Sequence, residues 1–173
     1  MAKMSIALIR DENAVDLDAI RTVNRLAFGQ DAEPTLVDRL RDEGYARVSL
    51  VAEVDGRVRG HILFSDLPIV TPDGATIIAY ALAPMAVAPE FQRREIGSAL
   101  DRAGLEACRA RGCRVVIVLG HRAFHPRFGF SSSLARQIKA PYSGEDFMAV
   151  ELEPGAMADV HGRVTYPPPF DEV

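Results

Sequence analysis

The chain has 173 residues, a length typical of one domain with its own hydrophobic core. Hydrophobic residues make up 48% of it and charged residues 25%, a globular composition that excludes a disordered chain. The net charge of −4 argues against nucleic acid as the main partner, because binding phosphates requires a basic excess or a basic face.

The sequence carries no sign of a metal site, an export signal or a membrane span. The two cysteines, Cys108 and Cys113, have no histidine at metal spacing, and we interpret them as reduced thiols. The first residues lack the apolar stretch of a signal peptide, and no apolar run approaches the ~18 residues of a membrane helix. We therefore expect a cytoplasmic protein that binds no metal and no membrane.

Taken in chain order, the first elements are a short strand and two helices. The apolar run at residues 6–9 is typical of an edge strand. Apolar residues at helical spacing between 15 and 27 predict a helix that begins near residues 11–13. A second short helix is expected after Pro34, since proline is common at the first helical position.

The next elements are an antiparallel hairpin and a buried strand. Residues 48–54 and 57–64 both have strand character, and the Asp55-Gly56 pair between them is a strong hairpin signal. Residues 77–87 are nearly all apolar, as in a central strand. Pro84 lies within this run, so the strand is expected to be distorted or bulged there.

A turn, a helix and another strand then complete one βαβ unit. Residues 88–95 form a polar turn, and apolar residues from Ile96 to Ala107 mark a helix that ends near Gly112. Residues 115–119 are a strongly β-branched strand.

The remaining residues predict a short helix, a last strand and a tail. The helix spans 124–128 and is closed by Gly129, the strand spans 147–152, and the proline-rich tail at 156–173 is expected to be irregular and on the surface. Together these elements predict an α+β fold with a mixed sheet in a single domain over 1–173.

The stretch from Pro84 to Leu100 has the clearest functional pattern. A buried strand ends in a turn and a helix start, where free backbone N–H groups and the helix dipole suit a pyrophosphate. Gly97 lacks a Cβ and lets a ligand approach the backbone, and Arg93 and Arg94 add positive charge. A glycine needed only for packing and a solvated charged turn are the alternative interpretations.

This stretch resembles the acyl-CoA-binding motif of the GNAT superfamily of N-acetyltransferases, in which Gln/Arg-x-x-Gly-x-Gly/Ala opens the helix. Gln92, Gly97 and the flanking residues match that motif. Glu95 stands where the family usually has glycine. A carboxylate there would face an anionic ligand, so either the neighbouring arginines offset it or the affinity for CoA is reduced.

Two further segments carry the resemblance. Residues 120–130 resemble the final GNAT segment, an aromatic-rich short helix that ends in Gly-Phe and flanks the CoA thiol. Many members carry a tyrosine there as general acid, and this chain has His125, which can donate a proton near neutral pH or be an ordinary structural histidine. Residues 147–156 resemble the C-terminal strand of the small bacterial YhbS-like branch.

The resemblance covers roughly residues 5–155 and implies the GNAT acyl-CoA N-acyltransferase fold, a mixed, mostly antiparallel sheet flanked by helices. It implies direct transfer of an acetyl group from acetyl-CoA to an amine of a small molecule or protein, and a homodimer is common in the family. The implied catalytic residue is His125. The implied cosubstrate residues are Met85, Ala86, Val87, Gln92, Arg93, Arg94, Glu95, Ile96, Gly97, Ser98 and Phe124.

The acceptor and the general base stay open at this point. Residues 77–87 contain no carboxylate, and Tyr80 is a poor base at neutral pH. Glu33 lies where the family's acceptor pocket usually forms, although a solvated carboxylate is the simpler interpretation. Glu95 and His125 motivate a rival function, a CoA-binding sensor that no longer catalyses. An interaction domain without a ligand is a second rival.

Overall fold

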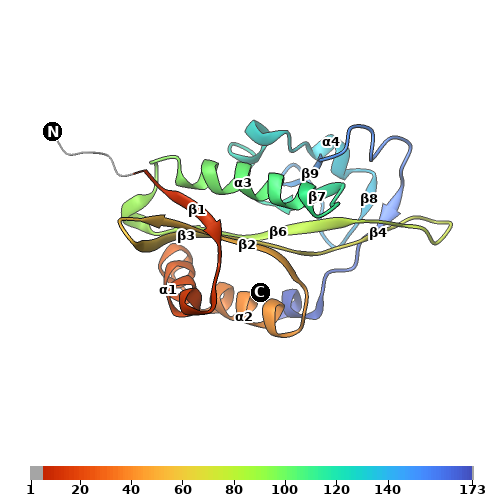
Figure 1. Cartoon of the computed structure of the whole chain (residues 1–173). Helices are drawn as coiled ribbons and strands as arrows, with labels where there is room; N and C mark the ends of the chain where they lie inside the picture. Colours follow the sequence, from red (N-terminus) through yellow and green to blue (C-terminus); the bar gives the residue numbers. More distant parts are fainter. Residues whose placement is uncertain (1–5, 173) are drawn as a thin grey trace.

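A six-stranded sheet forms the centre of this computed structural model, which describes residues 6–172 (Figure 1). Its strands lie in the order β1 (Leu8–Asp11), β2 (Ala46–Val54), β3 (Arg57–Asp66), β6 (Ala79–Val87), β7 (Val115–Leu119) and β9 (Phe147–Glu151). All neighbours are antiparallel except β6 and β7, which are parallel. The expected mixed, mostly antiparallel sheet and the βαβ unit are confirmed.

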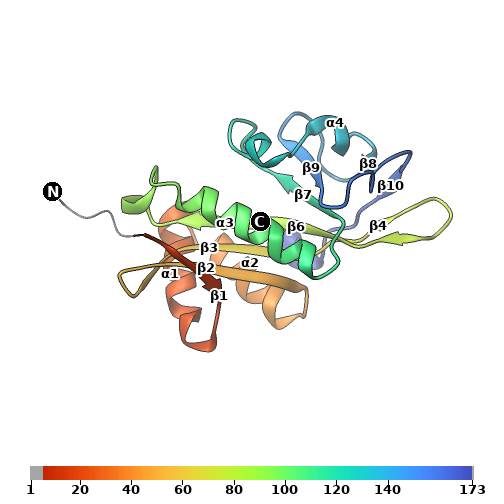
Figure 2. The same ribbon diagram turned by 45° about the horizontal axis from the view of Figure 1, so that its top comes forward.

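Helices cover both faces of this sheet (Figures 1 and 2). Helices α1 (Leu17–Phe28) and α2 (Ala32–Asp42) pack on one face, and α3 (Ile96–Ala110) packs on the other. Alternate residues of each strand supply the two cores, because neighbouring side chains on a strand point to opposite faces. The remaining short helices are η1 (Ala14–Asp16), η2 (Pro89–Phe91), η3 (His125–Phe128), α4 (Ser132–Ala135) and η4 (Pro168–Glu172).

The second helix begins earlier than expected. Helix α2 starts at Ala32, two residues before Pro34. A proline is tolerated there because the first N–H groups of a helix have no carbonyl acceptor within it.

The expected distortion at Pro84 is a bulge between β6 and β3. Ile62 pairs with Met85 and Phe64 pairs with Leu82, so β6 contains one more residue than β3 over this interval. An extra residue bends a strand and increases its twist. The bulge therefore redirects the last residues of β6, from Met85 to Val87.

The sequence did not indicate a second, small sheet at one end of the molecule (Figure 2). It contains four two-residue strands in the order β5 (Thr76–Ile77), β4 (Ile69–Val70), β10 (Gly162–Arg163) and β8 (Ile138–Lys139). Its apolar side packs into a core cluster with β7 and β9.

The C-terminal tail differs from the expectation of an irregular surface segment. Met157 is fully buried, Val164 is 3% exposed, and β10 and η4 are regular elements within the tail. Apolar side chains between the polar and proline positions draw this segment onto the core, because their burial is favourable whatever the local backbone propensity.

A buried polar network sits between the main sheet and α1. His61 on β3 is fully buried; its Nδ1 lies 3.1 Å from Asn24 Nδ2, and its Nε2 lies 2.9 Å from Ser49 Oγ. Asn24 Nδ2 also donates to the carbonyl of Ile20, so His61 Nδ1 is the acceptor and the ring is neutral. Burial, and then the charge of Arg41, lower the pKa of His61 to about 3.

This network makes the stability of the protein depend on pH. The unfolded chain binds a proton at His61 near pH 6.5, and the folded protein does not. The contribution of His61 to the free energy of unfolding is therefore complete above that pH and falls as the pH is lowered towards 3. We expect a loss of about 2 kcal/mol between pH 6.5 and pH 5. Denaturant unfolding of the wild type and His61→Gln at both pH values tests this. The same pH dependence in both proteins would contradict it.

Candidate functional site

The parallel strands β6 and β7 separate at the level of the bulge. They pair from Ala79 with Val115 to Leu82 with Val118, and no further. Beyond that point, Met85 to Val87 pair only with β3, while Leu119 pairs with Phe147 of β9. One backbone edge of β6 is therefore open at the carboxyl ends of two parallel strands, where ligands of α/β sheets commonly bind.

A cavity of about 290 Å³ lies between this edge and the start of α3. Nine residues of the predicted cosubstrate site line it, namely Met85, Val87, Gln92, Arg93, Glu95, Ile96, Gly97, Ser98 and Phe124. Phe91 and Arg127, which the sequence analysis did not single out, complete it. Ala86 and Arg94 lie outside: Ala86 is buried opposite His61, and Arg94 is exposed beside Phe91.

The helix start supplies hydrogen-bond donors to this cavity. Ala99 is the first residue of the helix region whose N–H bonds to a carbonyl of the same turn, that of Glu95, at 3.0 Å. The N–H groups before it have no such acceptor in an α-helix and are available to an anion. Gln92 holds the preceding loop closed, because its Nε2 donates to the carbonyl of Val87 at 3.0 Å.

Gly97 faces the open cavity. A Cβ at this position would meet its nearest neighbour, the Met85 side chain, at 3.6 Å, an ordinary contact. Packing therefore does not require glycine here. Any larger side chain would project into the cavity.

Arginines surround the same cavity and stack on its aromatic rings. The guanidinium carbons of Arg59 and Arg94 lie 4.7 and 5.0 Å from the centre of the Phe91 ring, and that of Arg127 lies 4.8 Å from the Phe124 ring. These arginines take part in none of the ion pairs found among residues 6–172. They give the helix start a positive field, which the carboxylate of Glu95 on the cavity wall opposes.

Glu95 occupies a left-handed backbone conformation, with φ of 64°. This conformation costs a residue with a Cβ roughly 1 kcal/mol, whereas glycine adopts it freely. The side chain also borders the anion-binding cavity. Both facts give a physical reason for the glycine that the resembling motif carries at this position.

We expect Glu95→Gly to raise the melting temperature by about 2–4 °C, because it releases the backbone strain, and to tighten acetyl-CoA binding severalfold, because it removes a negative charge. Glu95→Gln is the matched control, since it removes the charge and keeps the strained backbone. It should tighten binding without raising the melting temperature. Thermal unfolding measures the change in stability, and calorimetric titration measures the change in affinity. A lower melting temperature of Glu95→Gly would contradict the assignment of backbone strain to Glu95.

A second cavity, of about 400 Å³, lies on the other side of the opening and shares Met85 with the first. It is lined by the ends of β6 and β7, by Phe28, Glu33 and Leu36 of the first helices, by Gly120, His121 and His125, and by Tyr142, Tyr166 and Phe170. The C-terminal tail thus forms one wall. The rings of Tyr142, Tyr166 and Phe170 stack edge to face with centroids 5.1 and 5.2 Å apart.

His125 lies in this second cavity with a carboxylate behind it. The side chain is 5% exposed, and its Nδ1 lies 3.4 Å from Oδ2 of Asp101 on α3, which is fully buried. Neither Asp101 oxygen has a hydrogen-bond partner among the described residues. A buried carboxylate is costly without a partner, so the Nδ1 edge of the His125 ring, which faces it, is held in this orientation.

Gly120 allows the His125 ring to sit at the end of β7. A Cβ on Gly120 would come within 2.7 Å of His125 Nε2, so a side chain there would displace the ring. The Nε2 end of the imidazole therefore lies at the opening between β6 and β7, and the Nδ1 end faces Asp101.

Glu33 is the carboxylate of the second cavity. It is 8% exposed rather than solvated, and both of its oxygens accept from Gln30 Nε2, at 2.6 and 3.1 Å. Its position in α2 differs from the expected loop. The early start of that helix places the carboxylate against the cavity.

No group of three or more His, Cys, Asp or Glu side chains in residues 6–172 is arranged to hold a metal ion. No helix in that range has the length and apolar character needed to cross a membrane.

Several known proteins are similar to this chain in sequence and in fold. The sequence profile of the Acetyltransferase (GNAT) family matches residues 17–130. The uncharacterized N-acetyltransferase YjhQ of Escherichia coli is 38% identical over 130 residues, which cover 73% of this chain and 71% of that protein. The uncharacterized N-acetyltransferase YhbS of the same organism is 31% identical over 162 residues, or 92% and 95% of the two chains.

Two solved structures superpose over nearly the whole chain. The crystal structure of YhbS from Escherichia coli in complex with CoA has a TM-score of 0.88 and 30% identity, covering 99% of this chain and 95% of that one. A GNAT family acetyltransferase from Brucella melitensis in complex with acetyl-CoA has a TM-score of 0.78 and 34% identity, covering 97% and 100%.

Proposed function

Because the chain belongs to the GNAT family of acetyltransferases, we propose that it transfers the acetyl group of acetyl-CoA directly to the amine of an acceptor in the second cavity. The observation that carries this proposal is the opening between β6 and β7, with an anion-binding helix start on one side and His125 on the other. YhbS and the Brucella melitensis acetyltransferase, solved with CoA and acetyl-CoA, support the choice of cosubstrate.

The cosubstrate is assigned to the first cavity and the open strand edge. The pyrophosphate would accept hydrogen bonds from the N–H groups at the start of α3, with Arg93 and Arg127 beside it. The pantetheine arm would lie along Met85 to Val87 and use the backbone groups that β7 leaves unpaired, as an added strand does. The thioester then lies at the junction of the two cavities, near Met85.

The acceptor enters from the second cavity. An ammonium group is attracted by the buried carboxylate of Glu33, which we assign as the base that takes its first proton. The neutral amine attacks the thioester carbonyl, forming the C–N bond and an oxyanion that a backbone N–H near Val87 would stabilise. The oxyanion collapses, the C–S bond breaks, and the nitrogen releases its second proton to solvent.

His125 completes the reaction by protonating the departing thiolate. The imidazolium form gives the proton from Nε2 while Asp101 faces Nδ1, and the ring is protonated again from solvent. The products are the N-acetylated acceptor, CoA with a free thiol, and one released proton. Asp101 touches no substrate and acts as a positioning residue.

We also place this activity in the cytoplasm. Cys108 and Cys113 are both buried free thiols, a state that persists in reducing compartments.

An amine panel tests the proposal. Purified protein is incubated with acetyl-CoA and small amines, amino acids or peptides, and the free CoA thiol and the acetylated product are both quantified. Product that forms in proportion to CoA supports direct transfer. Saturable acetyl-CoA binding without product from any class of amine would contradict it and would favour the sensor interpretation.

A further inference from the structure

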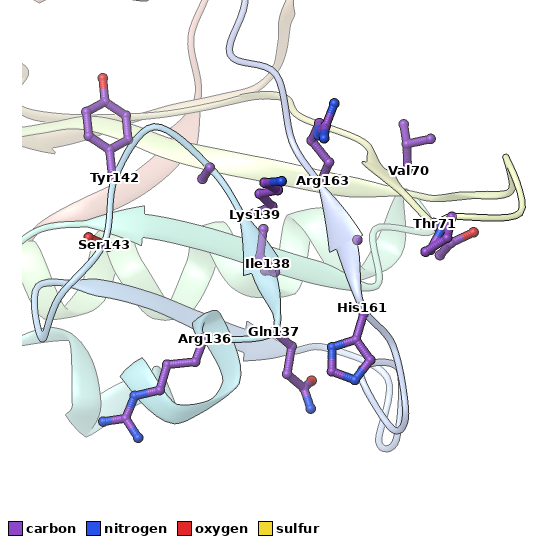
Figure 3. Close-up of a pocket in the computed structure, with 13 residues that line it drawn as sticks. Val70, Thr71, Arg136, Gln137, Ile138, Lys139, Tyr142, Ser143, His161 and Arg163 are labelled. Atoms are coloured by element: carbon purple, nitrogen blue, oxygen red, sulfur yellow. The ribbon is translucent and has the colours of Figure 1, made fainter.

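A third cavity, of about 730 Å³, lies over the outer side of the small second sheet (Figure 3). Its walls come from β4, β8, β10 and the loops beside them. They are Val70, Thr71, Pro72, Arg136, Gln137, Ile138, Lys139, Ala140, Tyr142, Ser143, His161, Gly162 and Arg163. This set contains three permanent cations and no carboxylate.

The register of the second sheet places two of these cations side by side. Arg163 pairs with Lys139 on one side and with Val70 on the other, so the three side chains share a face. The opposite face carries Ile69 and Ile138 into the core. Gly162 fits between them because a Cβ there would come within 2.4 Å of the Ile69 side chain. The apolar face therefore fixes Lys139 and Arg163 outwards, as Figure 3 shows.

Two like charges directly opposite each other on adjacent strands destabilise a sheet. Among residues 6–172, neither Lys139 nor Arg163 has a carboxylate partner that would relieve their repulsion. By contrast, Arg10, Arg21 and Arg41 each contact a carboxylate at 2.7 to 2.9 Å. Asp73, in the nearby turn, is held by the Thr71 hydroxyl and the Ala75 N–H. An anion bound between the two side chains would offset this repulsion.

Other polar groups line the same cavity. His161 and the hydroxyls of Ser143 and Tyr142 lie on its walls. The buried side-chain oxygen of Gln137 has no hydrogen-bond partner within residues 6–172, and a hydroxyl of a ligand would satisfy it. Arginine and lysine together suit the oxygens of phosphate or carboxylate groups.

This third cavity adjoins the acceptor cavity. Tyr142 lines both of them. The two cavities differ in charge, since the acceptor cavity contains the carboxylate of Glu33 and the third cavity contains Arg136, Lys139 and Arg163. One molecule with an ammonium group at one end and an anionic group at the other matches this distribution.

We propose that the third cavity binds the anionic end, a phosphate or carboxylate, of the amine that this enzyme acetylates. The acceptor is then zwitterionic: its ammonium group lies at Glu33, and its anionic group lies between Lys139 and Arg163, past the ring of Tyr142. This inference rests on the proposed function for the identity of the acceptor cavity, but the anion site can be tested without turnover.

The first test measures anion binding alone. Inorganic pyrophosphate and citrate are titrated calorimetrically, at constant ionic strength, into protein whose cosubstrate cavity is filled with excess CoA. We expect saturable binding to the wild type. In the double variant Lys139→Gln/Arg163→Gln we expect the affinity to fall at least tenfold. The control is Arg57→Gln, which removes an exposed cation that lines none of the three cavities. Absent binding, or equal binding in wild type and double variant, would overturn the anion site.

The second test uses acceptors in matched pairs. Ethanolamine is compared with phosphoethanolamine, which adds a phosphate group, and propylamine is compared with 3-aminopropanoate, which carries a carboxylate group. The two pairs therefore distinguish a preference for phosphate from a preference for carboxylate. We expect kcat/KM to be at least tenfold higher for one anionic member, and this preference to vanish in the double variant while CoA binding is kept. Equal preference in both proteins would overturn the assignment to the acceptor. If the wild type does not bind acetyl-CoA, that result would instead contradict the proposed function.

Discussion

Replacement of His125 by alanine is expected to lower kcat by about 10²- to 10⁴-fold, the usual contribution of a general acid. The ring lies at the opening between β6 and β7, buried against Phe124 and Phe130 and backed by Asp101. The affinity for acetyl-CoA should change little, because His125 is absent from the walls of the cosubstrate cavity. Steady-state kinetics and a binding titration separate the two effects. A variant with unchanged kcat would exclude His125 as the acid.

Asp101→Asn tests whether the carboxylate acts through that histidine. The amide has nearly the same shape and no charge, so it removes the electrostatic contact that orients the ring. We expect a smaller loss of kcat than for His125→Ala, with the affinity for acetyl-CoA kept. A purely structural role would lower stability and leave kcat of the folded protein unchanged.

Gly97→Leu is expected to weaken acetyl-CoA binding by about 100-fold or more, equivalent to ~2.8 kcal/mol. The leucine side chain would occupy the cavity of about 290 Å³ at the point where the pyrophosphate is assigned. The fold should tolerate the change, because the space beside Gly97 is the cavity itself and the nearest atom to a Cβ is 3.6 Å away.

Gly97→Ala is the matched control for this series. It adds only the Cβ and replaces a glycine near the start of a helix, which should stabilise the fold by about 0.5–1 kcal/mol. We expect its acetyl-CoA affinity to stay within a few-fold of the wild type. If Gly97→Ala unfolds the protein, the glycine serves packing. If Gly97→Leu binds acetyl-CoA as the wild type does, the pyrophosphate lies elsewhere.

The local signals in the sequence were sufficient for the main sheet. The Asp55-Gly56 turn, the apolar run at 77–87 and the helical stripe from Ile96 are each a strong local signal, and the elements they predicted are confirmed. Pro84 also predicted the bulge, since a proline cannot donate to a ladder inside a sheet. The separation of β6 from β7 follows from the bulge. It could not be predicted from Pro84 alone, because it depends on the pairing of both strands.

The parts that sequence reasoning missed depend on contacts between distant segments. Asp101 lies four residues after Gly97 on the buried face of α3, and this spacing was a usable signal, since a carboxylate interrupts an apolar stripe. His61 could not be assigned to a face, because a strand with buried residues on both sides shows no alternation. The two-residue strands of the second sheet are too short for any periodicity. Without that sheet, Lys139 and Arg163 are 24 positions apart and show no relation.

The position of the cosubstrate is tested most directly by amide hydrogen exchange with and without saturating acetyl-CoA. We expect slower exchange in the segments that contain Met85 to Val87, the start of α3 from Ile96, and the turn that holds Phe124 and His125. We expect little change in β1 and β2, which border neither of the first two cavities. Protection confined to other segments, or no protection at a saturating concentration, would contradict the assignment of this opening as the acetyl-CoA site.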